Sequence, residues 1–313
     1  MRMSSSSHLW KRAVPLGLAA LTALAAPAAA WDAMQPRTRE RAVALLLGAP
    51  PDADLANLLP ADGRPLGERQ RELFELASTW PDLVRDAGHA ARKAKYDHPA
   101  WHYVDWYWDL ITDGPQQGTP RDRIDLAAAP GSPAENIVER LRTLVPRLGA
   151  ANVEKADQAV DLAWVLHLAG DIGMPLHCSS RVTREEPQGD KGATLFKLDT
   201  AHGTLHWYWD SILTHAIPKQ AGEADEAYVG RLAALLVSRN PYSARALRLD
   251  LGHYEAWCND GYDLAKTVVY PPYLVREKLP PSYYQDLALG IAQPAIALAG
   301  YRLAALLDWM LGR

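Results

Sequence analysis

The stretch WVLHLAGDIGMPLH, residues 164–177, holds three potential metal ligands at close spacing. On an α-helix His167 and Asp171 share one face, because residues four apart are neighbours across a turn. The glycine and proline that follow end the helix, so His177 can turn back toward the same space. We therefore predict a helix that presents a metal site at its C-terminal end.

A second His/Asp pair with the same spacing is formed by His206 and Asp210. Two further segments add the same residue types, WPD at 80–82 and WHYVD at 101–105. Neutral imidazoles and carboxylates are the ligands that zinc prefers outside thiolate sites. One such pair is common as an ordinary helix-surface pair. Two pairs together with Pro-Leu-His indicate a metal site.

The first thirty residues have the composition of a secretory signal. Arg2, Lys11 and Arg12 precede an apolar stretch, Ala13–Ala26, and Ala28–Ala30 is an Ala-x-Ala cleavage signal. We predict a signal peptide over residues 1–30 and a single domain over 31–313, secreted or periplasmic. The alternative is an uncleaved anchor, although the apolar core is short for a membrane span. We expect no other segment that is long and apolar enough to span a membrane, and no stable membrane insertion.

Charge and cysteine content limit the partners. Removing the three basic residues of the leader takes the net charge from −4 to −7. This acidity argues against a broad basic groove for duplex DNA, but bound zinc would add local positive charge. Cys178 and Cys258 are the two cysteines. In an exported chain they favour one disulfide, and two buried free thiols are the alternative.

The periodicity of apolar residues predicts an all-α domain with long loops, because strands of period two are absent. Two polar loops are candidates for the rim of a site, residues 112–131 and 179–192. The expected helices include 39–47, 67–95, 153–170 and 282–311.

These motifs and their order resemble the secreted zinc-dependent single-strand nucleases of the mould S1/P1 family. The resemblance covers the chain from Trp31 and extends to LAGYRLA, residues 298–304, in the last predicted helix. It implies the multi-helix fold that this family shares with bacterial zinc-dependent phospholipase C. It also implies a monomeric endonuclease that cleaves single-stranded DNA or RNA to 5′-phosphorylated products, with 3′-nucleotidase activity.

The resemblance further implies three zinc ions. One would be held by Asp82, His102, His167 and Asp171, and a separate ion by His177, His206 and Asp210. Asp171 would bridge to an ion whose other ligands are the amine and carbonyl of Trp31, released by signal cleavage. A free α-amine titrates near pH 8, so zinc can displace its proton.

Catalytic and substrate-binding residues follow from the same resemblance. Asp82 would orient the attacking water, and Arg85 would contact the phosphate. Tyr103 would stack on a base, which requires unpaired bases, and Asp105 would bind the base edge. The base-binding loop of the family ends in Asn, where this chain has Thr194, so we expect a looser or different base preference.

One departure concerns a ligand. The family has a histidine five residues after the first Trp, and this chain has Pro36. The ion at Trp31 would then be weakly held, or would take a water or a distant ligand such as His98. Two other functions compete with the nuclease: a phospholipase C, and a non-catalytic zinc-binding protein. Phospholipases typically have Glu where Asp210 stands, which favours the nuclease.

Overall fold

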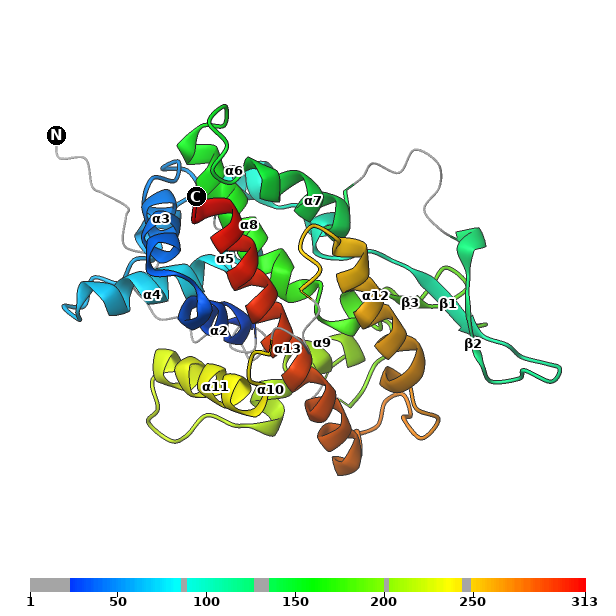
Figure 1. Cartoon of the computed structure of the whole chain (residues 1–313). Helices are drawn as coiled ribbons and strands as arrows, with labels where there is room; N and C mark the ends of the chain where they lie inside the picture. Colours follow the sequence, from blue (N-terminus) through cyan, green and yellow to red (C-terminus); the bar gives the residue numbers. More distant parts are fainter. Residues whose placement is uncertain (1–22, 86–88, 127–134, 200–202, 244–248) are drawn as a thin grey trace.

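The computed structural model describes residues 23–85, 89–126, 135–199, 203–243 and 249–313, and it is mostly helical, as predicted. Figure 1 shows the helices gathered into one body around α13. The α-helices are α2 (Ala25–Ala33), α3 (Pro36–Leu47), α4 (Leu66–Ala77), α5 (Trp80–Leu83), α6 (Ala90–Tyr96), α7 (Ile137–Leu144), α8 (Lys155–Asp171), α9 (Leu205–Asp210), α10 (Ile212–Ala216), α11 (Asp225–Arg239), α12 (Tyr254–Leu264) and α13 (Ser282–Leu311).

Short helical turns and strands complete the chain. The 3₁₀ turns are η2 (Leu55–Leu58), η4 (Pro99–His102), η5 (Ile124–Leu126), η6 (Val145–Arg147) and η7 (Pro175–His177), and η8 (Ala265–Val269) is a π-helical turn. The strands are β1 (Tyr107–Leu110), β2 (Pro120–Asp122) and β3 (Ser180–Arg181).

The last helix, α13, is the central element of the fold and matches the predicted range. It packs against α2, α3, α8, α10 and α11. Our expectation that no segment beyond the leader is long and apolar enough to cross a membrane was wrong, because α13 meets both criteria. Its most apolar window is 56% buried inside the fold, which is typical of a core helix.

Helix α8 carries the first predicted ligands and also ends as predicted. Its side chains are buried almost all round, including Leu162, Trp164 and Leu166, because α3, α7 and α13 pack around it. The chain leaves the helix after Asp171 and turns back in η7, which ends at His177. The break predicted from glycine and proline is therefore present.

The predicted helix over residues 67–95 is interrupted. Ser78 Oγ donates to Glu75 O and Thr79 Oγ1 donates to Leu76 O, so both hydroxyls bind the carbonyls of the last turn of α4. Pro81 follows within two residues and has no N–H to continue the ladder. The chain therefore restarts as the short α5, and apolar periodicity alone does not reveal that break.

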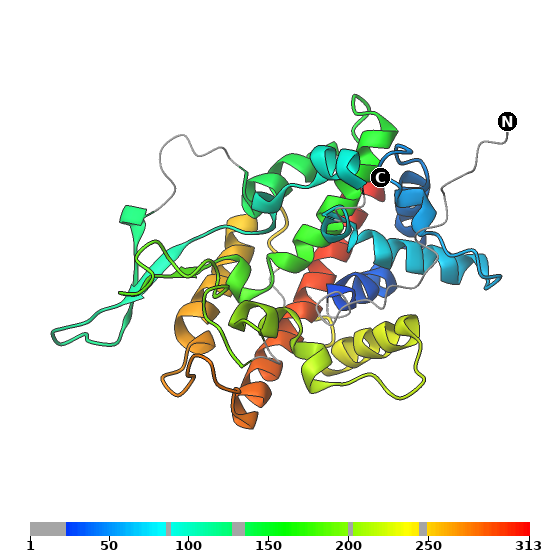
Figure 2. The ribbon, with the colours of Figure 1, turned by 180° about the vertical axis from the view of Figure 1, so that it is seen from behind.

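A small sheet was not predicted. β1 pairs antiparallel with β2 and parallel with β3, with Tyr107 opposite Ser180. Figure 2 shows the β1–β2 ribbon extending away from the helical body. The strands are too short for period-two alternation to show in sequence. The β1–β3 pairing matters for the site because it holds the segment after η7 beside the segment after η4.

The end of the predicted leader is part of this fold. Residues 1–22, which contain its basic region and most of its apolar stretch, lie outside the described residues. Helix α2 runs unbroken through the expected cleavage point, and Ala30 and Ala25 are fully buried against α13 and α11. A Cβ added at Gly300 of α13 would lie 2.9 Å from Ala26 O, so this glycine permits the close approach of α2.

The predicted disulfide between Cys178 and Cys258 is present, with its Cα atoms 5.5 Å apart. It joins the residue after η7 to α12 across a separation of 80 residues. Because Cys178 directly follows His177, the bond anchors a candidate ligand to the helical body. A disulfide also fits a protein exported from the cytoplasm.

Candidate metal centre

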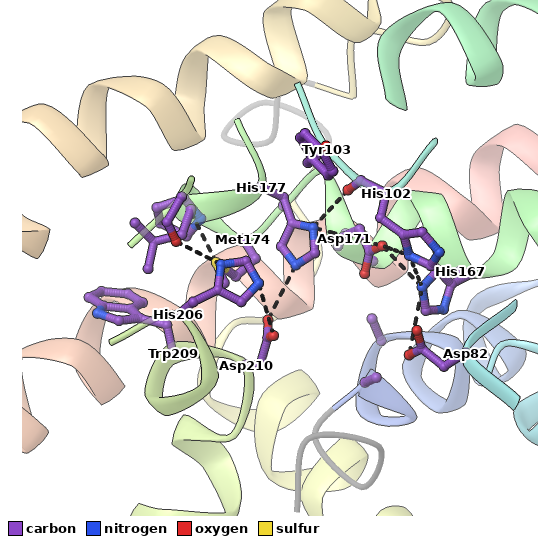
Figure 3. Close-up of a pocket in the computed structure, with 18 of the residues that line it drawn as sticks. Asp82, His102, Tyr103, His167, Asp171, Met174, His177, His206, Trp209 and Asp210 are labelled. Carbon is purple, nitrogen blue, oxygen red and sulfur yellow. Dashed lines mark hydrogen bonds and ion pairs between the residues drawn. The ribbon is translucent and has the colours of Figure 1, made fainter. Parts of the chain in front are cut away.

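All the histidines and aspartates predicted as metal ligands line one cleft of about 690 Å³. Within it, two groups each place three ligand atoms within 4.8 Å of one another. The ligand cleft, as we call it, lies between the C-terminal end of α8, the turn η4 and helix α9, and Figure 3 shows the side chains converging. The first group is Asp82, His102 and His167, and the second is His177, His206 and Asp210.

Asp171 lies between the two groups. Its Oδ2 is 3.0 Å from His167 Nε2 and 3.1 Å from His102 Nδ1 on one side. On the other side the same oxygen is 3.9 Å from His177 Nδ1. Asp82 completes the first group, with its Oδ2 3.9 Å from His167 Nε2. This placement suits a carboxylate that bridges neighbouring cations.

Backbone carbonyls fix the orientation of three of the rings. His167 Nδ1 lies 2.7 Å from Ser78 O, His177 Nδ1 lies 2.7 Å from His102 O, and His206 Nδ1 lies 2.7 Å from Gly192 O. A carbonyl only accepts, so each Nδ1 must carry the hydrogen and donate it. The lone pair of the neutral ring is then on Nε2, which faces the cleft. Such outer contacts are typical of metal-ligating histidines.

The second group is tied together by Asp210. Its Oδ1 is 3.3 Å from His177 Nε2, and its Oδ2 is 3.3 Å from His206 Nε2. His206 and Asp210 lie one turn apart on α9, whose N-cap Thr204 accepts from Trp207 N–H. The predicted spacing of four therefore does place both side chains on one face.

Without a cation, the carboxylates favour protons on two of the rings, those of His167 and His177. Burial opposes the charge of His167, but Asp171 and Asp82 outweigh it and raise the pKa of this ring to about 9. Burial likewise opposes the charge of His177, but Asp171 and Asp210 raise the pKa of this ring to about 10. The effect on Asp171 is the reverse. Burial alone would raise the pKa of its carboxyl group, but His167 and His177 outweigh burial, and the pKa falls well below its usual range.

These donors fit zinc. They are imidazole nitrogens and carboxylate oxygens. Three of the four rings have Nδ1 occupied by a backbone carbonyl, and a carboxylate faces Nε2 of each of these three rings. A cation that replaces the ring protons would satisfy the same carboxylates. Metal binding would therefore release protons.

Arg85 lies at the Asp82 end of the ligand cleft and lines it. Its guanidinium is 3.4 Å from Asp82 Oδ1 and 3.4 Å from Asp97 Oδ1, and its side chain is 41% exposed. Residues 86–88, directly after it, lie outside the described residues. The structure thus places a cation beside the carboxylate predicted to orient water.

The predicted substrate-binding residues lie at the mouth of the same cleft. Tyr103 is 43% exposed, which argues against a core role. Asp105 is half-buried, and burial together with the charge of Asp190 raises its pKa to about 6, opposed by a hydrogen bond from Ser180. Thr194 is exposed and also lines the cleft.

Two residues discussed as possible ligands, Trp31 and His98, are not brought to either group, and neither is Pro36, which stands where the family has a histidine. Trp31 lies inside α2, and its ring packs on Phe74 with centroids 5.2 Å apart. Pro36 opens α3 as an exposed residue outside the cleft. His98 stacks on Trp101 with ring centroids 4.0 Å apart and does not line the cleft. In the uncleaved chain, then, the place predicted for an ion at Trp31 lacks its amine.

Some contributors have no signature in the sequence. The carbonyls that orient the rings belong to Ser78, His102 and Gly192, and any residue has a carbonyl. Lys191 also lines the cleft. The signal for it was the charged loop 179–192, which we expected at the rim of a site.

A helical domain with two His/Asp groups lining one cleft is an arrangement that suits a metal-dependent hydrolase. Comparison with known families makes this specific: the chain matches the S1/P1 Nuclease family over residues 28–312. The protein belongs to the S1/P1 nuclease family, whose members are zinc-dependent hydrolases of phosphodiester bonds. No curated protein matches the chain.

Proposed function

We propose that the protein is an exported zinc-dependent endonuclease that acts as a monomer. It would hydrolyse single-stranded DNA or RNA to 5′-phosphorylated products and remove 3′-phosphates from nucleotides. The observation that carries this proposal is the exposed ring of Tyr103 beside the two ligand groups. A base stacked on an exposed aromatic ring must be unpaired, and stacking contributes about 1–3 kcal/mol per base whatever the sequence.

The side chains of the ligand cleft have distinct roles in this proposal. Asp82 is half exposed, so one of its oxygens is available to orient a water molecule for in-line attack. Arg85 would hold a phosphoryl oxygen, and Asp105 the edge of the stacked base. Zinc ions bound at the two groups would acidify water and stabilise negative charge on the phosphoryl oxygens.

An ion at Trp31 is proposed only for the processed chain. Cleavage after Ala30 would free the Trp31 amine, and it would also remove Ala23 and Ala26, which line the ligand cleft. The absence of a histidine at Pro36 leaves this ion one ligand short. A protein with extra residues before Trp31 should therefore have less zinc and less activity.

A phospholipase C is the second candidate, because one wall of the ligand cleft is apolar. Met174, Ala295, Ile296 and Ala299 line it, and such a wall suits a lipid chain. Asp210, where phospholipases have Glu, favours the nuclease.

The test uses protein that starts at Trp31, single-stranded DNA and phosphatidylcholine vesicles, each with and without a zinc chelator. Cleavage of DNA that the chelator stops and zinc restores would support the nuclease. Hydrolysis of the vesicles alone would favour the phospholipase. Bound zinc without either activity would favour a non-catalytic protein.

A further inference from the structure

The turn after Asp190 has an unusual backbone. Three consecutive residues have positive φ angles: Lys191 at 55°, Gly192 at 57° and Ala193 at 64°. Glycine adopts this region freely, but a residue with a Cβ pays roughly 1 kcal/mol or more. Strained residues of this kind persist where the surroundings fix them, and they cluster at functional sites.

Buried contacts hold this turn in place. The carboxylate of Asp190, which is 1% exposed, accepts from Arg181 N–H at 3.0 Å, from Ala193 N–H at 3.0 Å and from the Tyr270 hydroxyl at 2.6 Å. A Cβ at Gly192 would overlap Leu176 O, so only glycine fits there. The turn is therefore fixed against both β3 and η7.

The result of this arrangement is a lysine at the edge of the ligand cleft. Lys191 lines the cleft together with Thr194, and its charge acts on Asp105. Among the described residues, no ion pair involves its ammonium group. The other cation that lines the cleft, Arg85, is already paired with Asp82 and Asp97. Among the described residues that line the cleft, Lys191 is thus the lysine or arginine that no carboxylate holds.

The position of the turn separates Lys191 from the reacting centre. Gly192 O contacts Nδ1 of His206, while Nε2 of that ring faces Asp210 across the second group. The turn therefore lies behind His206, on the Asp105 side of the ligand cleft. A phosphate held by Lys191 would therefore lie toward Asp105, and not between the two ligand groups.

We propose that Lys191 binds the backbone phosphate adjacent to the scissile one in a single-stranded nucleic acid. This inference rests on the proposed nuclease function and adds a specificity residue to it. An ammonium group is a compact donor that suits a phosphate oxygen. Its contact would favour a polymer over a substrate that has a single phosphate.

The experiment compares two substrates in the zinc-loaded protein starting at Trp31: a single-stranded oligonucleotide and bis(4-nitrophenyl) phosphate, which has one phosphate. Lys191→Asn removes the charge and keeps a residue that tolerates positive φ. Lys191→Arg keeps the charge. Lys197→Asn is the matched control, because Lys197 is an exposed lysine of the same region that does not line the cleft.

We expect Lys191→Asn to raise KM for the oligonucleotide about fivefold to tenfold, with kcat and hydrolysis of the small diester within about twofold of wild type. The slope of log affinity against log salt should fall by about 0.7, as for one lost contact to a single strand. Lys191→Arg should restore both, and Lys197→Asn should change neither. Anisotropy with a phosphorothioate single strand measures the affinity without turnover.

Equal losses on both substrates would overturn the proposal, because they would show a structural role in the turn. Unchanged oligonucleotide affinity and salt slope would overturn it as well. Failure of the proposed function is a separate result: wild-type protein would then hydrolyse the small diester but bind no single-stranded nucleic acid.

Discussion

The substitution Gly300→Ala should change the stability of the uncleaved chain and of the processed chain differently, because only the uncleaved chain has the residues that pack on Gly300. The added Cβ would lie 2.9 Å from Ala26 O, 3.1 Å from Ala29 Cβ and 3.5 Å from Ala30 N. All three nearest atoms belong to residues that cleavage after Ala30 removes. The same substitution should therefore stabilise the processed form relative to the form that keeps these residues.

The magnitudes follow from two opposing effects. Overpacking against a backbone oxygen costs about 1–3 kcal/mol, while Gly→Ala inside a helix contributes about 0.5–1 kcal/mol. In protein starting at Trp31 only the second effect remains, so Tm should rise by about 1–4 °C at about 2–4 °C per kcal/mol. In protein starting at Ala23 the overpacking is present as well. The Tm of the Gly300→Ala variant should then lie about 2–12 °C below the Tm that the helix effect alone would give.

The assay is thermal unfolding of both forms, with Gly290→Ala as the control. Gly290 lies in the same helix, and a Cβ there meets nothing within 4 Å. The control should raise Tm slightly and equally in both forms. If Gly300→Ala lowered the Tm of the two forms by the same amount, the packing of α2 against α13 described above would be wrong.

Three further predictions concern the ligands, the disulfide and a buried acid. Asp82→Asn and His167→Ala should each lower bound zinc, measured by atomic absorption, and reduce hydrolysis by at least about tenfold; unchanged zinc in both would remove them from the site. Cys178→Ser with Cys258→Ser opens a loop of 80 residues, which should cost up to about 4–5 kcal/mol in urea unfolding; no loss would contradict this. Burial raises the pKa of Glu75 from 4.5 to about 7, despite a hydrogen bond from Arg71. The folded state therefore holds the proton of Glu75 more tightly than the unfolded state does. The free energy of unfolding should fall as pH rises from about 4.5 to about 7. Glu75→Gln should flatten that fall between urea midpoints at pH 5 and pH 8, and an unchanged profile would exclude Glu75 as its cause.

The grouping of the candidate ligands could be predicted because residue type and spacing survive folding. Residues four apart on a helix share a face whatever surrounds the helix. His167 and Asp171 do so, and so do His206 and Asp210. The turn at His177 followed from glycine and proline chemistry. That these segments meet in one cleft could be expected from the family resemblance, not from the periodicity of any single helix.

The errors have a common physical cause, which is that local patterns do not report tertiary contacts. The helix predicted over 67–95 breaks because the hydroxyls of Ser78 and Thr79 bind backbone carbonyls, and the apolar spacing continues across the break. The burial of α2 depends on Gly300, which is 270 residues from Ala30 and whose partner no local pattern identifies. Long-range carbonyls such as Ser78 O are equally invisible in sequence.

One turn connects a candidate metal ligand to the lysine that we propose for substrate binding. The carbonyl of Gly192 orients His206, and the residue before it on the same turn, Lys191, lines the ligand cleft. Asp190 and Tyr270 fix both at once, so loosening the turn should disturb the metal ligand and the cation together. Removing the lysine charge alone should leave His206 undisturbed. This difference is why the charge substitution at Lys191, and not a substitution at Asp190, isolates the contact with the substrate.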